Sequence, residues 1–228
     1  METSKKSAII IGATGLTGNV LLQELLKDDR YGTVKLFSRS SVGISSPKLE
    51  EHLLNLFDIE AHKAKFIADE VFCCIGTTMS KTPNKEQYGA IDYGIPVTVA
   101  KLCKENSIET ICVISALGAN AESSVFYNRV KGEMEQAVLS MSIPNTYLLQ
   151  PSLIGGKRKE KRLGEWLAKK FFIILRPLFV SSLKKYRVIP PQEIAQCMVI
   201  LANRANKERR RILSDEISKI VEGDRNRT

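Results

Sequence analysis

The sequence predicts an α/β fold, a Rossmann-like doubly wound parallel sheet with a small C-terminal substrate-side subdomain. Two observations support this prediction. An apolar run at residues 7–11 enters a glycine-rich turn that is followed by a helical pattern, and strand-like and helix-like segments alternate through the first 150 residues. Such alternation produces a parallel sheet with right-handed crossovers. A glycine turn in the first unit favours the strand order 3-2-1-4-5-6.

Six strands are expected, at residues 7–11, 34–38, 53–57, 71–75, 110–114 and 146–150. Apolar residues at helical spacing predict helices over 16–27, 84–103 and 125–139, and a short helix over 59–67. Pro96 must start, kink or split the helix that contains it. Residues 40–47 include Gly43, Pro47 and four serines, which predicts a loop.

The pattern changes after Pro151. We expect residues 1–150 to form an NAD(P)-binding core, and residues 151–228 to form a substrate-side and helical segment packed on the same domain. Helices are expected at 166–180 and 192–201, followed by a charged tail from Asn206. The apolar run at 166–180 is too short to span a bilayer, so we expect no membrane span. It would close over the substrate cleft, or alternatively contact a membrane surface or a partner.

Composition gives the expected compartment and a basic segment. The five cysteines form no C-x-x-C pair and no secretory or transit segment is visible, which predicts a reduced, cytoplasmic protein. The net charge is +9, and residues 157–187 hold eleven Lys and Arg against two Glu, so this segment accounts for the whole excess. It could be a solvated face, a wall for an anionic ligand, or a nucleic-acid or membrane-surface patch.

Glycines at three-residue spacing are the most informative motif. Gly12 lets the first strand turn sharply, Gly15 lets the backbone approach a diphosphate, and Gly18 lets the helix pack on its strand. The helix N-terminus would then face an anion. An ordinary strand-to-helix turn is the alternative. The residues assigned to cofactor binding here are Gly12, Thr14, Gly15, Leu16, Thr17 and Gly18.

A tyrosine and a lysine four residues apart carry the candidate chemistry. Tyr127 and Lys131 fall on one face of the predicted helix, so the ammonium can lower the pKa of the phenol. A phenol tuned in this way can exchange a proton with a carbonyl oxygen. Ser115 follows the fifth strand, where open α/β sheets place their ligands, and could bind the same oxygen.

Together, the glycine turn, Ser115 and the Tyr127/Lys131 pair resemble the short-chain dehydrogenase/reductase superfamily. Finer motifs resemble its atypical branch of Tat-interacting oxidoreductase-like proteins, over nearly the whole chain from Ser7 to about Leu201. These motifs are Cys-Ile-Gly-Thr-Thr at 74–78, Tyr-Asn-Arg-Val-Lys-Gly-Glu at 127–133, Gln-Pro-Ser-Leu-Ile-Gly at 150–155, and Arg158-x-Glu160-x-Arg162.

The resemblance implies NAD(P) binding and a set of roles. Tyr127 would donate the proton, Lys131 would hold the nicotinamide ribose, and Ser115 would polarise the substrate carbonyl. The loop of Gly76, Thr77 and Thr78 would run beside the adenosine and diphosphate, and Pro151 and Ser152 would flank the nicotinamide. Typical members carry an Asn-Ala-Gly motif where this chain has Cys-Ile-Gly-Thr-Thr. Some atypical members bind the cofactor without established turnover.

Charge at the end of the second strand predicts the cofactor. An acid there would favour NAD, but this chain has Arg39 between two serines, which suits a 2′-phosphate. We therefore predict NADP(H) over NAD(H), with a surface arginine as the alternative. Asp58 is placed near the adenine amino group, or alternatively caps the next helix.

The leading hypothesis is an NADP(H)-dependent oxidoreductase acting on a carbonyl or alcohol, with Tyr127 as acid/base and an acidic substrate held near Arg158 and Arg162. The alternative is a non-catalytic NADP(H)-binding regulator that acts through a protein partner. A homodimer is also compatible with the sequence. Nucleic-acid binding is not expected, because no recognisable module accompanies the basic segment, and no metal site is expected.

Overall fold

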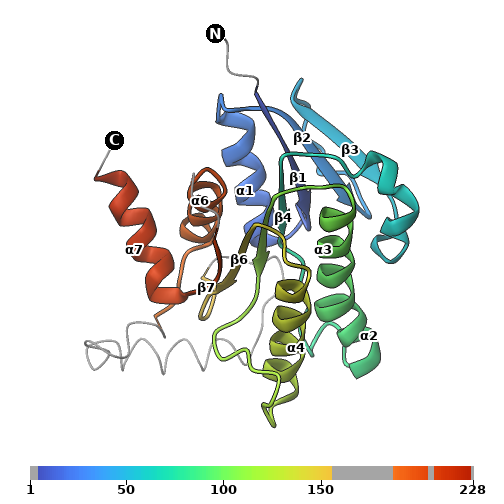
Figure 1. Cartoon of the computed structure of the whole chain (residues 1–228), viewed down its shortest axis with the longest axis vertical. Helices are drawn as coiled ribbons and strands as arrows, with labels where there is room; N and C mark the ends of the chain where they lie inside the picture. The colour runs from blue at the N-terminus through green and yellow to red at the C-terminus, as the bar shows by residue number, and fades with distance from the viewer. Residues whose placement is uncertain (1–4, 156–186, 205–207, 227–228) are drawn as a thin grey trace.

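The fold is a seven-stranded, all-parallel sheet in the order β3-β2-β1-β4-β5-β6-β7 (Figure 1). It comes from a computed structural model that describes residues 5–155, 187–204 and 208–226. The predicted order of the first six strands is confirmed, and a seventh strand extends it. The strands are β1 (Lys6–Ile11), β2 (Tyr31–Ser38), β3 (Leu49–Leu53), β4 (Glu70–Cys73), β5 (Thr110–Ile114), β6 (Asn145–Gln150) and β7 (Arg209–Leu213).

Helices cover both faces of the sheet, and a separate apolar core lies under each layer. One layer holds α1 (Leu16–Lys27), α6 (Pro191–Ala202) and α7 (Ser214–Arg225). The other holds the 3₁₀ segment η1 (Leu56–Lys65), α3 (Ile95–Glu105) and α4 (Phe126–Ser140). Because both faces are covered, β4 and β5 are buried along their whole length, as expected for central parallel strands.

The third strand differs from its prediction. It spans Leu49–Leu53 rather than 53–57, and the apolar run that suggested a strand instead enters η1. Leu53 and Phe57 are 58% and 52% exposed, so within that run it is Leu56, at the start of η1, that enters the core. β3 is an edge strand with the sequence Leu-Glu-Glu-His-Leu, and an edge strand can form with few apolar residues.

The predicted helix at 84–103 forms as three consecutive segments. α2 (Lys85–Gly89) runs into a π-helical turn, η2 (Ala90–Gly94), which leads directly into α3. Pro96 lies in the first turn of α3, directly after the π-helical turn, so the helical region is divided at this proline. The helices predicted at 16–27, 125–139 and 192–201 form within one or two residues of their expected bounds.

The C-terminal segment contributes to the same sheet. β7 pairs in parallel with β6 and is followed by α7, where the sequence suggested only a charged tail. The described residues do not include the predicted helix at 166–180. They also leave out the basic segment apart from Arg187, and with it Arg158 and Arg162. Among the helices that the structure does describe, none combines the length and apolarity needed to cross a membrane.

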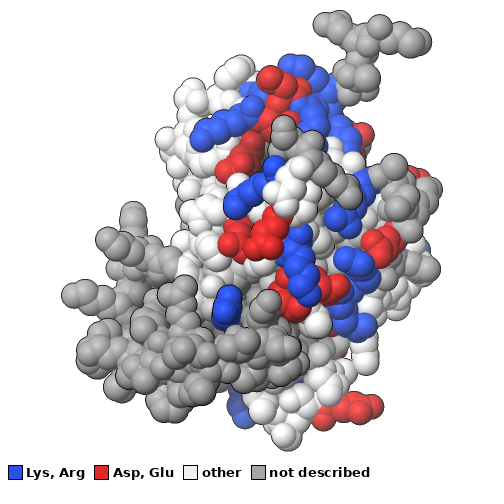
Figure 2. Space-filling view, turned by 90° about the vertical axis from the view of Figure 1, so that its left-hand side faces the viewer, with Lys and Arg blue, Asp and Glu red and all other residues white. Residues whose placement is uncertain are grey.

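Charges of both signs alternate on the face that carries α6 and α7 (Figure 2). Lys219 and Asp215 form an i,i+4 ion pair there at 2.9 Å. Ser218 also donates a hydrogen bond to Glu193, across from α7 to α6. Mixed charges of this kind suit a solvated surface, because neighbouring carboxylates offset the field of each cation.

Candidate functional site

The glycine turn after β1 packs against the segment that follows β4. Gly12 has φ +89°, and a Cβ at this position would lie 2.9 Å from the carbonyl oxygen of Cys74. At Gly18, a Cβ would lie 2.2 Å from the carbonyl oxygen of Gly12. Side chains at either position would therefore force the turn, the helix and β4 apart. This close packing sits between β1 and β4, where the strand order reverses and open α/β sheets bind ligands.

The N-terminus of α1 faces this turn without a capping side chain. Gly15 is the N-cap residue and offers no side-chain acceptor to the first-turn N–H groups. Thr14 and Gly15 are exposed, while Thr17 and Gly18 are buried against the turn. A helix start of this kind presents backbone donors and a positive dipole end to an anion. The turn therefore fits the diphosphate of a dinucleotide.

Lys131 on α4 lies beside the loop that follows β4. Its Nζ is 2.8 Å from Oδ1 of Asp92, and both side chains are almost completely buried. The other carboxylate oxygen of Asp92 accepts a hydrogen bond of 2.7 Å from the backbone N–H of Thr77. Asp92 therefore connects α4 to the predicted cofactor loop, of which Gly76 is exposed and Thr77 and Thr78 are half-buried.

Opposing effects act on the pKa of Lys131. Burial penalises the charged ammonium, but the Asp92 carboxylate and the Tyr127 phenol favour it, and the pKa lies above the ordinary value of 10.5. The carboxylate of Asp92 therefore offsets the cost of burying the Lys131 ammonium. Tyr88, whose ring meets that of Tyr127 edge-on at 6.5 Å, has a raised pKa because of burial and the nearby Asp92 charge.

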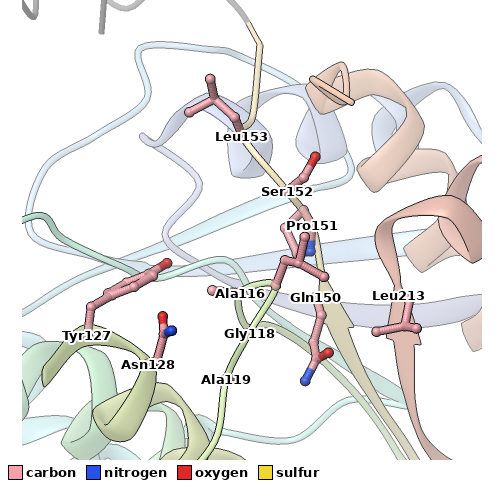
Figure 3. Close-up of a pocket in the computed structure, with 11 residues that line it drawn as sticks. Ala116, Gly118, Ala119, Tyr127, Asn128, Gln150, Pro151, Ser152, Leu153 and Leu213 are labelled. Carbon is pink, nitrogen blue, oxygen red and sulfur yellow. The ribbon is translucent and has the colours of Figure 1, made fainter. Parts of the chain in front are cut away.

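Tyr127 lies in the wall of a cavity of about 710 Å³ at the carboxyl ends of β5 and β6 (Figure 3). Its side chain is 37% exposed. Asn128 lies next to it on α4, and the facing wall comes from Gln150, Pro151 and Ser152. The remaining lining residues are mostly apolar: Ala116, Leu117, Gly118, Ala119, Leu153 and Leu213.

Ser115 is not among the residues that line this cavity. Its side chain is buried, and its hydroxyl donates a hydrogen bond of 2.5 Å to Glu135 on α4. Glu135 also accepts from Gln150 at 2.8 Å and pairs with Arg211 at 2.5 Å. In this structure the hydroxyl hydrogen of Ser115 is bound to a buried carboxylate and the residue does not line the cavity, so its assignment to a substrate oxygen stays a prediction.

Pro151 and Ser152 occupy the expected end of β6. The carbonyl of Pro151 accepts from the N–H of Leu117 at 3.0 Å, which ties the two loops at the cavity mouth together. The hydroxyl of Ser152 donates to the carbonyl of Arg187 and accepts from Ser214 at 3.1 Å. Ser152 therefore joins the end of β6 to both C-terminal segments.

Arg39 follows directly after β2, is exposed, and forms no ion pair with another described residue. The register pairs Ile11 with Phe37, so Arg39 leaves its strand at the level of the glycine turn. Asp58 is exposed in the first turn of η1. The alternative role for Asp58 as helix cap is wrong, because Asn55 is the capping residue and accepts from the N–H of Phe57.

Three site residues were missed by sequence reasoning: Asp92, Glu135 and Asn128. Glu135 continues the four-residue spacing of Tyr127 and Lys131, so a polar stripe along α4 could have revealed it. Asp92 gave no local signal, because its partner Lys131 lies on a different helix. Within residues 5–155, 187–204 and 208–226, no cluster of three potential metal ligands occurs.

Sequence comparisons identify relatives in animals and fungi. No family model matches the chain. Protein HTATIP2 of Rattus norvegicus is 31% identical over 175 residues, covering 75% of this chain and 72% of the relative. Protein FMP52, mitochondrial, of Debaryomyces hansenii is 33% identical over 159 residues, covering 68% and 70%. The FMP52 protein of Eremothecium gossypii is 27% identical and covers 94% and 97%.

Solved structures share the fold at low sequence identity. UDP-glucose 4-epimerase of Thermotoga maritima, in a structure with UDP-glucose, has a TM-score of 0.67 at 11% identity, covering 95% of this chain and 82% of the epimerase. The structure of Bordetella bronchiseptica WbmG in complex with NAD and UDP has a TM-score of 0.67 at 11% identity. The match covers 96% of this chain and 77% of WbmG. At these identities the likeness shows a common fold.

The relatives also correct one expectation. The composition predicted a cytoplasmic protein, but the FMP52 relatives from several yeasts are named mitochondrial, which contradicts that prediction. A compartment is poorly encoded in the features that we used, because buried free cysteines fit any reducing compartment.

The motifs, the strand order and the sequence identities agree, and the chain belongs to the HTATIP2/FMP52 family of atypical short-chain dehydrogenase/reductase Rossmann proteins.

Proposed function

We propose that this protein is an NADP(H)-dependent oxidoreductase that acts on a carbonyl or alcohol substrate. One observation carries the proposal: Tyr127 lines the cavity at the carboxyl edge of the sheet, one helical turn before the buried, charged Lys131. A phenol near a fixed cation and open to a cavity is suited to proton exchange with a substrate oxygen.

The described residues fit a dinucleotide. The glycine turn and the uncapped start of α1 would hold the diphosphate, through the N–H groups of Leu16, Thr17 and Gly18. The loop Gly76–Thr78 would border the adenosine side, with Asp58 near the adenine. Arg39 would meet a 2′-phosphate with its forked donors, which favours NADP(H). When bound, the nicotinamide supplies or accepts the hydride.

The protein side of the reaction is then proton transfer and positioning. In reduction, the Tyr127 phenol gives its proton to the carbonyl oxygen as the carbon receives the hydride, and the phenolate is reprotonated from water. Lys131 stabilises the phenolate by its charge. Asn128 offers an amide donor in the same wall of the cavity and makes no side-chain hydrogen bond with another described residue. We assign to Asn128 the second contact to the substrate oxygen.

The proposal also divides the chain into a cofactor-binding part and a substrate-binding part. Residues 1–150 would hold the cofactor, and residues 151–228 would form the substrate side. Pro151, Ser152, Leu153 and Leu213 support this division, since they line the cavity wall opposite Tyr127 (Figure 3).

A non-catalytic NADP(H)-binding regulator acting through a protein partner is the second candidate. The direction of the Ser115 hydroxyl favours it, because a serine bound to Glu135 does not offer its hydrogen to a substrate. Both candidates require the same cofactor site, so turnover is the property that separates them.

Replacing the phenol hydroxyl tests the proposal. The wild-type protein is screened with NADPH against aldehydes and ketones, both uncharged and acidic. Tyr127→Phe is expected to lower turnover of any active substrate at least about 100-fold, because it removes the proton donor. NADPH affinity, followed by nicotinamide fluorescence, should change less than about twofold, since the ring and Lys131 remain.

Tyr93→Phe is the matched control. Tyr93 is 38% exposed, close to the value for Tyr127, but lies on η2 outside the cavity. It should retain wild-type turnover. Wild-type protein that binds NADPH but reduces none of the carbonyls would contradict the enzyme proposal and favour the regulator. Undiminished turnover by Tyr127→Phe would exclude Tyr127 as the acid/base.

A further inference from the structure

Lys131 forms a buried ion pair with a residue of a different element. Lys131 is on α4, while Asp92 is in the π-helical turn between α2 and α3. Their side chains are about 4% and 1% exposed, so water contributes little to either charge. Oδ1 of Asp92 meets the ammonium at 2.8 Å and has no other donor among the described residues.

A buried ammonium without a carboxylate is unstable. Burial of a lysine favours the neutral amine and can lower its pKa by 3–5 units, roughly into the neutral range. Here the nearby groups reverse that effect. The groups that face the Lys131 ammonium are Asp92 from η2, Tyr127 from α4 and Cys73 from β4, with Tyr88 of α2 packed on Tyr127. Of these groups, only Asp92 carries a carboxyl group, which can supply a full counter-charge to the ammonium.

The second contact of Asp92 fixes where that charge sits. Its Oδ2 accepts from the N–H of Thr77, and Asp92 and Lys131 both approach Gly76. A Cβ at Gly76 would lie 3.5 Å from the Asp92 carboxylate and 3.9 Å from Nζ of Lys131. The ion pair therefore lies directly against the loop that follows β4.

We propose that Asp92 is a positioning residue that keeps Lys131 protonated and holds its ammonium against the Gly76–Thr78 loop. This assignment rests on the geometry of the described residues alone. Its consequence, a permanent cation beside Tyr127 and the cofactor loop, rests on the proposed function. Asp92 acts through Lys131 and does not line the cavity that contains Tyr127.

The test measures the ionisation of Lys131 directly. Lysine is labelled at the Cε carbon, its NMR shift is followed from pH 6 to 11, and the Lys131 signal is assigned by its loss in Lys131→Met. In the wild type we expect no titration of Lys131 below about pH 10.5. In Asp92→Asn, which keeps an acceptor for Thr77 but removes the charge, the titration should move down by two units or more.

Asp215→Asn is the matched control. It removes the carboxylate from an ion pair of similar length, Asp215–Lys219 at 2.9 Å, but on the exposed surface of α7. The pKa of Lys219 should fall by less than about half a unit, because water solvates its ammonium. If Asp92 had only a structural role, the pKa of Lys131 in Asp92→Asn would fall no more than the pKa of Lys219 falls in Asp215→Asn.

Two results would overturn the proposal: Lys131 titrating below its ordinary value in the wild type, or an unchanged titration in Asp92→Asn. If Asp92→Asn does not fold, the wild-type titration decides. NADPH affinity separates this proposal from the function. Suppose that the Lys131 titration shifts in Asp92→Asn, but NADPH affinity above the new pKa is unchanged from wild type. The assignment of Asp92 would then stand, and a cofactor role for Lys131 would be contradicted.

Discussion

Ser115 at the end of β5 donates its hydroxyl hydrogen to Glu135, a carboxylate buried on α4. The same carboxylate binds Gln150 at the end of β6 and Arg211 on β7. One side chain of α4 is therefore tied to three neighbouring strands. This network holds α4 against the carboxyl edge of the sheet, where Tyr127 lines the cavity.

Ser115→Ala should therefore affect folding more than chemistry. Loss of a buried hydrogen bond to a charged group is expected to lower the free energy of unfolding by about 1–3 kcal/mol. We expect turnover within about tenfold of wild type, because the hydroxyl is not in the cavity wall. Urea denaturation and steady-state kinetics measure the two effects.

Ser140→Ala provides the control for Ser115→Ala. Ser140 is at the exposed end of α4 and its hydroxyl donates to the carbonyl of Ala137 at 2.7 Å. Its replacement should change stability by less than about 0.5 kcal/mol, as for most surface positions. The opposite pattern for Ser115→Ala, unchanged stability with turnover lost, would restore Ser115 as a residue that contacts substrate.

Cofactor choice should depend on Arg39. Arg39→Ala is expected to weaken NADPH binding at least about tenfold and to leave NADH binding within about twofold, because only NADPH carries the 2′-phosphate. Paired titrations by nicotinamide fluorescence measure both affinities. Arg30→Ala, which removes the same charge just before the opposite end of β2, should change neither. Equal binding of NADPH and NADH by the wild type would contradict the prediction of NADP(H).

The close approach at Gly18 gives a prediction on stability. Gly18→Ala places a methyl group 2.2 Å from the carbonyl oxygen of Gly12, so the turn or the helix must move. We expect a loss of about 3 kcal/mol or more in the free energy of unfolding, together with loss of NADPH binding. Gly223→Ala in α7 is the control, since a Cβ there meets nothing within 4 Å. It should stabilise the protein by up to about 1 kcal/mol. Equal effects of the two substitutions would show that the turn tolerates a side chain.

The buried strands and helices of this fold were predictable, and the edges were not. β4 and β5 are covered on both faces, so they appear in the sequence as continuous apolar runs. β3 and β7 are the two edge strands and read Leu-Glu-Glu-His-Leu and Arg-Arg-Arg-Ile-Leu. Because a strand at an edge pairs on one side only, its polar sequence did not distinguish it from a loop.

The residues of the candidate site also fall into those that the sequence predicted and those that it did not. Residues fixed by local spacing were predicted: the glycines of the turn, and Tyr127 with Lys131 one helical turn apart. Residues fixed by tertiary contacts were not. Asp92 reaches Lys131 from 39 positions away in sequence, and Ser115 was assigned to the substrate because nothing local indicated that Glu135 would bind it.

The cysteines should be unreactive in the native protein. Cys73, Cys103, Cys112 and Cys197 are buried and Cys74 is partly so, and all five are free. Burial raises the pKa of Cys73 to about 11 and that of Cys197 to about 12, so thiolate is scarce at pH 8.

We expect a chromogenic disulfide reagent to label less than one thiol per native chain within minutes at pH 8, and all five thiols in urea. Because these pKa values are raised, the native rate should increase with pH, by about tenfold per unit below pH 10. Rapid native labelling at pH 8 that is lost in Cys74→Ser would contradict this prediction. It would identify Cys74 as a reactive thiol next to the glycine turn, since the carbonyl of Cys74 packs against Gly12.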